Sequence, residues 1–135
     1  MKSKKIFILY VIWICFIWSN SLLPATQSSN LSGSLSYQLY SLLHLPVDFE
    51  LFHTFIRKCA HFSEYAVLGG LAAFSFSCWK KGIGTSILVA CLDETLQLFI
   101  DGRSGQISDV LIDSAGILCG FFIVFFITKH FSKKD

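Results

Sequence analysis

The stretch "IRKCAHFSEYAVLG", from Ile56 to Gly69, runs directly into the apolar segment "GLAAFSFSCW". Its polar and charged side chains stand where an apolar segment begins: Arg57, Lys58, His61 and Glu64. A helix places residues i, i+4 and i+7 on one face, so Arg57, His61 and Glu64 form a polar stripe. Because lipid does not solvate charged groups, this stripe has to face protein or water. The stretch therefore predicts a membrane helix that carries a polar site at one end.

The composition of the whole chain indicates an integral membrane protein. The 135 residues include fourteen Phe, and the mean hydropathy is +0.60, which is more apolar than a small soluble domain. Four stretches approach the roughly 20 apolar residues that a span requires: 6–23, 59–79, 83–100 and 110–128. We therefore expect an all-α fold, in which residues 1–135 form one membrane domain with a bundle of four transmembrane helices.

The segment between the first two of these stretches predicts a further short helix. In "SGSLSYQLYSLLHLP", leucines recur at helical spacing with serines between them, at Leu35, Leu39, Leu42 and Leu43. Such a pattern is typical of an interfacial helix on the outer bilayer surface, or of a cover packed on the bundle. Pro46 then breaks the pattern and Asp48 can cap a new helix, which we expect to start near Phe49 and continue through the second span.

The distribution of lysines predicts the orientation of the chain. They lie before the first span, in the loop after the second and behind the fourth, at Lys2, Lys4, Lys5, Lys80, Lys81, Lys129, Lys133 and Lys134. By the positive-inside tendency, both termini are cytoplasmic, and residues 24–58 and 101–109 are outside the plasma membrane. The N-terminal segment also fits a signal peptide, but its nearly spanning length favours an anchor.

Acidic residues in the third and fourth spans lie near the same outer end as the first polar stripe. Glu94 is six residues before Ile100, and Glu64 is six residues after Lys58, so both lie roughly 9 Å below the outer surface. We expect one outward-opening polar pocket made of Arg57, Lys58, His61, Glu64, Asp93, Glu94, Gln97, Arg103, Asp109 and Asp113. Groups of this kind inside a membrane mark functional sites; a purely structural ion-paired plug is the alternative.

Small residues in two spans predict close helix packing. Gly69 and Gly70 are adjacent in the second span, and Gly116 and Gly120 have GxxxG spacing in the fourth. Such spacing lets the backbones of membrane helices approach each other.

The chemistry of the polar residues favours binding over catalysis. His61 and Glu64 have i, i+3 spacing, but one such pair is weak evidence for a metal, and a hard cation would suit this oxygen-rich set best. We therefore expect no metal, no cofactor and no nucleic-acid partner. An enzyme acting on a lipid-linked envelope substrate, with His61 as general acid or base, remains the alternative, although no nucleophile motif or phosphate loop supports it. A proton-coupled transporter would need polar residues in the cytoplasmic half, and the spans have none there.

Two stretches together resemble the VanZ-like family of small membrane proteins: "FIRKCAHFSEYAVLGG" and "DETLQLFIDGRSGQISDVLIDSAGILCG". "WSNSLLP" resembles that family's exit from its first span. The resemblance implies a cell-envelope protein that lowers sensitivity to teicoplanin-like glycopeptides. Its partner would be a membrane lipid, a cell-wall precursor or the lipoglycopeptide antibiotic itself, bound at the membrane surface.

Overall fold

The computed structural model describes residues 4–44 and 46–131, with the backbone alone at positions 25 and 27–31. These residues form five helices, α1 (Lys4–Ser21), α2 (Ala25–Leu43), α3 (Phe49–Ser75), α4 (Trp79–Gln97) and α5 (Ile107–Phe131). The expected all-helical fold is confirmed for this part of the chain. The predictions for Lys2, Lys133 and Lys134 concern residues outside the described ranges.

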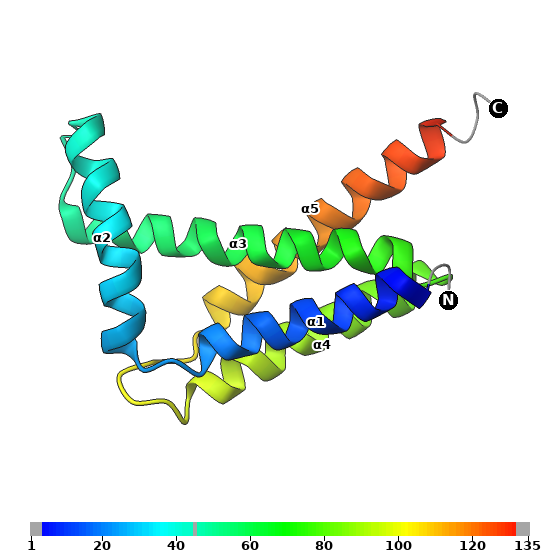
Figure 1. Cartoon of the computed structure of the whole chain (residues 1–135), viewed down its shortest axis with the longest axis horizontal. Helices are drawn as coiled ribbons and strands as arrows, with labels where there is room; N and C mark the ends of the chain where they lie inside the picture. The colour runs from blue at the N-terminus through cyan, green and yellow to red at the C-terminus, as the bar shows by residue number, and fades with distance from the viewer. Residues whose placement is uncertain (1–3, 45, 132–135) are drawn as a thin grey trace.

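The helices run back and forth between two ends of the molecule. In Figure 1, α1, α3 and α4 lie side by side, and α5 passes across them. The most extensive contact in the bundle joins α3 to α5. The connections α1–α2 and α4–α5 lie at one end, while the N-terminus and the α3–α4 connection lie at the other (Figure 1). This arrangement brings residues far apart in sequence together at the end where α2 stands.

The predicted start of α3 is confirmed at Phe49. The Asp48 carboxylate caps the helix, because its Oδ1 accepts hydrogen bonds from the backbone N–H groups of Glu50 at 2.9 Å and Leu51 at 3.3 Å. Such a cap satisfies backbone donors that have no partner within the first turn. Because α3 then continues without a break to Ser75, one rigid element carries both the polar stripe and the small residues.

Helix α2 is longer than the short helix expected from the leucine spacing. It begins directly after Pro24 and spans 19 residues. The leucines predicted only its second half, because the serine-rich first half has no apolar periodicity. Tyr40 packs against Phe49 and Phe52 of α3, with ring centroids 5.5 and 5.6 Å apart, so α2 is attached to the start of α3.

The expectation of four spanning helices is corrected. Within the described residues, only α1 and α5 are long and apolar enough to cross a membrane by length and composition. The stretches predicted as the second and third spans are helical as parts of α3 and α4. However, α3 carries Arg57, Lys58 and Glu64, and α4 carries two lysines and two acids. These charges lower the mean hydropathy of both helices below that of a typical span.

The predicted close packing through glycines is confirmed between α3 and α5. A Cβ atom at Gly69 would collide with the backbone of Ile117, and one at Gly120 would collide with the carbonyl group of Ala66. Gly116 faces the Phe62 carbonyl oxygen in the same way. The two helix backbones are therefore in direct contact, as small residues permit.

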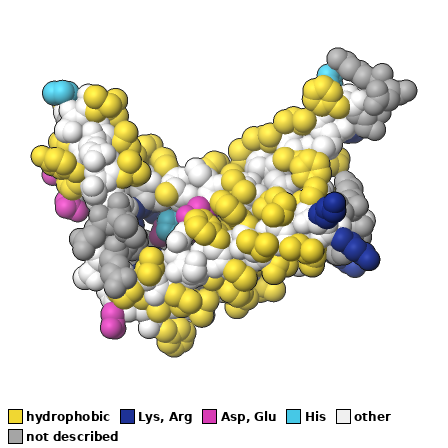
Figure 2. All heavy atoms as spheres, in the orientation of Figure 1, with side chains coloured by type: hydrophobic (Ala, Val, Ile, Leu, Met, Phe, Trp, Pro, Cys, Tyr) yellow, Lys and Arg dark blue, Asp and Glu magenta, His cyan; other side chains and the backbone are white. Residues whose placement is uncertain are grey.

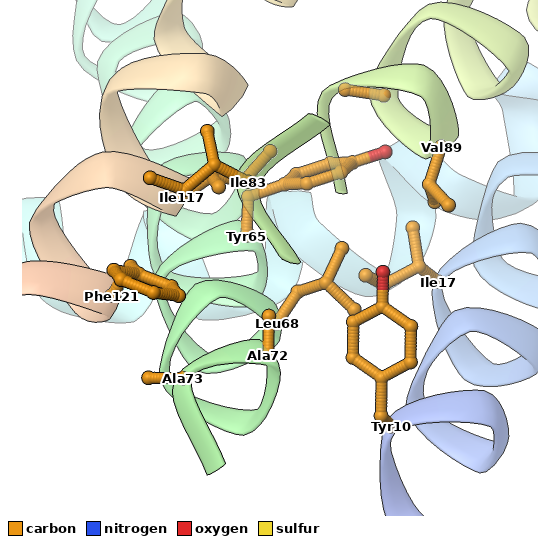
Figure 3. Close-up of a cluster of buried hydrophobic side chains, with 11 residues drawn as sticks. Tyr10, Ile17, Tyr65, Leu68, Ala72, Ala73, Ile83, Val89, Ile117 and Phe121 are labelled. Atoms are coloured by element: carbon orange, nitrogen blue, oxygen red, sulfur yellow. The ribbon is translucent and has the colours of Figure 1, made fainter. Parts of the chain in front are cut away.

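The apolar core combines side chains of α1, α3, α4 and α5. Figure 3 shows Tyr10 and Ile17 of α1 together with Leu68 of α3, Val89 of α4 and Ile117 of α5 in one cluster of buried side chains. Because α1 supplies part of this core, it is an integral element of the folded bundle.

The outer surface of the bundle is apolar over a wide area. Figure 2 shows hydrophobic side chains across most of the visible face of the helices. On α1 and α5 these exposed side chains include Ile8, Leu9, Val11, Ile12, Phe16, Leu111, Leu118, Phe122, Ile123, Phe126 and Ile127. Soluble monomers rarely expose contiguous apolar surface on this scale, so this face is suited to lipid.

Candidate functional site

A cavity of about 280 Å³ lies at the end of the bundle where α1 meets α2 and α3. Polar and apolar side chains line it together: Asn20, Ser21, Leu23, Ser32, Leu35, Ile56, Arg57, Ala60, His61, Glu64 and Arg103. Figure 2 shows a hollow in which histidine, acidic and basic side chains lie close together. Arg57, His61 and Glu64 share one wall, as their i, i+4 and i+7 spacing predicts.

The acids of α4 are buried beside this cavity. Asp93 is 0% and Glu94 4% exposed, and the neighbouring Gln97 is 4% exposed. The Gln97 amide donates to Asp93 Oδ2 at 3.3 Å and to Glu94 Oε1 at 3.2 Å. Ser21 Oγ, at the end of α1, also donates to Asp93 Oδ2, at 2.8 Å. These hydrogen bonds hold two carboxylates in fixed orientations inside the protein.

Arg103 lines the cavity, as expected, and also holds the end of α1. Its Nε donates to the Leu23 carbonyl oxygen at 2.9 Å, and its Nη2 donates to that of Asn20 at 3.0 Å. Burial lowers the pKa of the Arg103 guanidinium, and Arg57 lowers it further. An arginine still keeps its charge at neutral pH, so Arg103 brings a positive charge to the cavity wall.

The turn that carries Arg103 depends on two glycines. Gly102 has a φ of 74°, in the left-handed region that favours glycine. A Cβ atom at Gly105 would collide with the Glu94 carbonyl oxygen. This close approach lets the backbone N–H of Gln106 donate to Glu94 Oε2 at 2.9 Å. The Gly-bounded turn therefore positions both Arg103 and Glu94.

A second group of polar residues joins α3 to α5. The Lys58 Nζ donates to Asp109 Oδ1 at 2.7 Å. One turn further along both helices, His61 Nδ1 lies 3.9 Å from Asp113 Oδ1. A smaller cavity of about 100 Å³ is lined by residues of this group, including Arg57, Lys58, His61 and Asp109. Because His61 lines both cavities, it connects the two polar groups.

Several buried polar atoms have no hydrogen-bond partner among the described residues. Five of them belong to the polar residues of α3, α4 and α5, namely the Tyr65 hydroxyl, His61 Nδ1, Asp93 Oδ1 and both carboxylate oxygens of Asp113; the other two are Trp18 Nε1 and Ser36 Oγ. Buried polar groups normally have partners, so this concentration of unpartnered atoms is unusual. It also argues against a purely structural ion-paired plug, because the polar atoms of such a plug would form hydrogen bonds and ion pairs with one another.

Comparison with known proteins supports the resemblance read from the sequence. A family model described as VanZ/LLP1 matches residues 6–128. The chain belongs to this family. Neither a curated protein nor a solved structure matches the chain. The VanZ/LLP1 match and the two apolar helices are consistent with a membrane protein.

The sequence reasoning missed some residues that belong to this candidate site. Asn20 lines the cavity and donates from Nδ2 to Glu64 Oε1 at 3.4 Å, and Ser21 binds Asp93. Both belong to "WSNSLLP", where two polar residues end an otherwise apolar segment. This signal was available in the sequence. The role of Gln106 could not be predicted from the sequence, because this residue acts through its backbone N–H.

Proposed function

We propose that this VanZ/LLP1-family chain is a multi-pass protein of the cell envelope that binds an anionic lipid headgroup or lipid-linked cell-wall precursor. The observation that carries the proposal is the composition of the 280 Å³ cavity. Arg57 and Arg103 supply positive charge, while Leu23, Leu35 and Ile56 line the same space with apolar surface. An amphipathic molecule with a phosphate group and an acyl chain has the complementary chemistry.

Arg57 is the residue best placed to bind the anion. Its side chain is exposed, and it forms no ion pair or hydrogen bond with any other described residue. Arg103 is committed to two carbonyl oxygens, so it contributes charge from a fixed position. A free guanidinium beside a fixed one can bind phosphate with paired hydrogen bonds.

The proposed orientation places this cavity outside the cytoplasm. Lys4 and Lys5 begin α1, Lys80 and Lys81 begin α4, and Lys129 ends α5. The starts of α1 and α4 lie at the end of the bundle opposite to α2 (Figure 1), and Figure 2 shows most of the visible basic side chains there. By the positive-inside tendency this end is cytoplasmic, so the cavity is at the outer surface.

Lipid binding is tested with the protein purified in detergent. Native mass spectrometry should detect a co-purified anionic lipid or precursor. Phosphatidylglycerol added to the protein in detergent should also bind. Arg57→Gln should weaken binding about tenfold, the loss expected for one charge-assisted contact. Lys80→Gln removes the same charge at the far end and should have no effect. Equal affinity of the two variants would contradict the proposal.

Orientation is tested by labelling with a membrane-impermeant thiol reagent in intact cells. The five native cysteines are all free and exposed, so they are first replaced by serine. Ser104→Cys, in the turn beside the cavity, should be labelled from outside, while Lys81→Cys should be labelled only after the cells are opened. The reverse pattern would invert the proposed topology.

The envelope role predicts a difference between two antibiotics. Expression in a susceptible Gram-positive host should raise tolerance to teicoplanin-like lipoglycopeptides more than to vancomycin, because an acyl chain concentrates a drug at the bilayer surface. Glu64→Ala and Arg103→Ala should remove the effect while the protein stays in the membrane. Unchanged tolerance at verified expression would refute a resistance role, and active alanine variants would mean that the polar residues are structural.

A further inference from the structure

Three side chains from three different helices converge inside the bundle. His61 is on α3, Glu94 on α4 and Asp113 on α5. Each offers one atom capable of binding a metal, and these three atoms all lie within 4.8 Å of one another. Along the chain, only His61 and Glu64 are close on one helix, and because one such pair is weak evidence, the sequence led to the expectation that no metal binds. The tertiary structure replaces that pair with a set that no sequence spacing reveals.

Two of these three residues, His61 and Asp113, have buried polar atoms that lack the hydrogen bonds such atoms require. Asp113 is 0% exposed, and neither of its carboxylate oxygens has a hydrogen-bond partner among the described residues. His61 Nδ1 is also buried without a partner, and its separation of 3.9 Å from Asp113 Oδ1 is too long for a hydrogen bond. An unpartnered carboxylate in this setting is costly. Lone pairs of different residues therefore face a common space.

The described basic residues do not neutralise these acids. Lys58 is held by Asp109 at 2.7 Å, and Arg103 is bonded to backbone carbonyl oxygens. Glu94 and Asp113 together bring two negative charges when both are ionised, with Asp93 buried nearby. A divalent cation would neutralise the pair and supply the missing partner for Asp113 at the same time.

We propose that His61, Glu94 and Asp113 bind a divalent first-row transition metal ion such as Zn²⁺ or Mn²⁺. An ion at the centre of a triangle with sides of 4.8 Å lies about 2.8 Å from each corner, and closing to about 2.1 Å requires side-chain shifts of under 1 Å. One imidazole and two carboxylates form a donor set that suits such ions. The more oxygen-rich sites of Ca²⁺ use six to eight ligands.

The surroundings of the three ligands support a metal site. Gln97 Nε2 donates to Glu94 Oε1, and the Gln106 backbone N–H donates to Glu94 Oε2. These bonds fix the orientation of the carboxylate, as outer-shell partners do in metal sites. His61 lines both cavities, so an ion can reach the site through polar space. The remaining coordination position can be filled by water from either cavity.

The test uses the full-length protein in detergent after treatment with a chelator. Wild-type protein should bind one equivalent of Zn²⁺ or Mn²⁺ per chain, measured by isothermal titration and by elemental analysis after dialysis. Asp113→Asn should weaken binding by at least about 100-fold. Removing a ligand reduces metal affinity more than removing an outer-shell partner, which typically reduces it about 10–100-fold. Asp101→Asn removes an exposed acid in the connection between α4 and α5; it is the control and should bind as the wild type does. Co²⁺ should give a visible absorption spectrum only in proteins that retain the triad.

Stability supplies a second readout that does not depend on affinity. Metal should raise the Tm of the wild type and of Asp101→Asn but not of Asp113→Asn. Without metal, Asp113→Asn should unfold at or above the wild-type temperature, since it removes a buried carboxyl group whose ionisation is unfavourable. If Asp113→Asn does not fold, His61→Gln at the partly exposed position takes its place. Absence of stoichiometric binding to folded wild-type protein, or equal binding by the triad variant, would overturn the proposal.

Discussion

The contact between α3 and α5 has two halves that bury their surfaces in different ways. Toward the α3–α4 connection, Gly69 and Gly120 bring the backbones together, and the contact consists of close van der Waals packing. Toward α2, the same helices face each other through Lys58 and Asp109 and then through His61 and Asp113. The first half leaves no room for another atom. The second leaves buried polar atoms without partners.

This difference separates what holds the bundle together from what a ligand can use. Close packing between small residues stabilises membrane helix pairs directly. Buried charges are a poor source of stability, because their desolvation cost offsets most of their attraction. The two halves should therefore respond oppositely to substitution: changes in the glycine half should cost stability, and changes in the polar half should cost binding more than stability.

The largest effect is expected from Gly120→Leu. Its side chain would displace the Ala66 carbonyl group of α3, and overpacking against backbone should cost about 3 kcal/mol or more of unfolding free energy. Gly84→Leu is the matched control, because a Cβ at Gly84 meets nothing within 4 Å, and it should cost nothing. Reversible unfolding in mixed micelles measures both, and similar losses would disprove the role given to the α3–α5 contact.

Arg103→Gln should have the next largest effect. It removes both hydrogen bonds to the end of α1, and bonds from a partly buried charged donor together should contribute about 2 kcal/mol. Arg57→Gln is the control on the same cavity and should change stability by less than about 0.5 kcal/mol. The Arg103→Gln variant should also be cleaved faster by proteases near residues 22–24. Equal stability of the two variants would contradict the structural role of Arg103.

Removing a single hydroxyl group distinguishes a satisfied buried tyrosine from an unsatisfied one. The Tyr10 hydroxyl bonds with Ser86 Oγ at 3.1 Å and donates to Thr85 Oγ1 at 3.3 Å, so Tyr10→Phe should cost about 1 kcal/mol. The Tyr65 hydroxyl lies beside the Asp93 carboxylate but makes no hydrogen bond of good geometry with a described residue, so Tyr65→Phe should cost less than Tyr10→Phe in metal-free protein. Chemical denaturation of the two variants gives the comparison, and a larger loss at Tyr65 would mean that its hydroxyl has a partner.

The smallest effect is expected from the Lys58–Asp109 pair. The two side chains are 38% and 20% exposed, and pairs that water can reach contribute about 0.2–1 kcal/mol. A double-mutant cycle with Lys58→Gln and Asp109→Asn should give a coupling energy in that range, with the double variant no worse than the worse single one. A coupling well above 1 kcal/mol would show that this pair, unlike the His61–Asp113 pair, is a main stabiliser.

Local patterns predicted the elements of this fold that depend on neighbours in the chain. Asp48 was recognised as a cap because a side-chain acceptor before a helical pattern satisfies backbone donors two and three residues later. Close packing at Gly69, Gly116 and Gly120 was predictable because the small residues recur at helical spacing. The start of α2 was missed because a serine-rich helix has no apolar periodicity. The number of spans was overestimated because the charges in α3 and α4 make both helices less apolar than α1 and α5.

The sequence by itself determined the helical class, the family and the end of the bundle where the polar residues gather. Apolar periodicity, capping and motif spacing are all properties of short stretches of chain. Only the tertiary structure decided which polar atoms meet. It placed Arg103 on the carbonyl oxygens of Asn20 and Leu23 and brought His61 to Asp113 across the α3–α5 contact. Those choices depend on how helices from distant parts of the chain rotate and pack, and helix periodicity alone does not specify them.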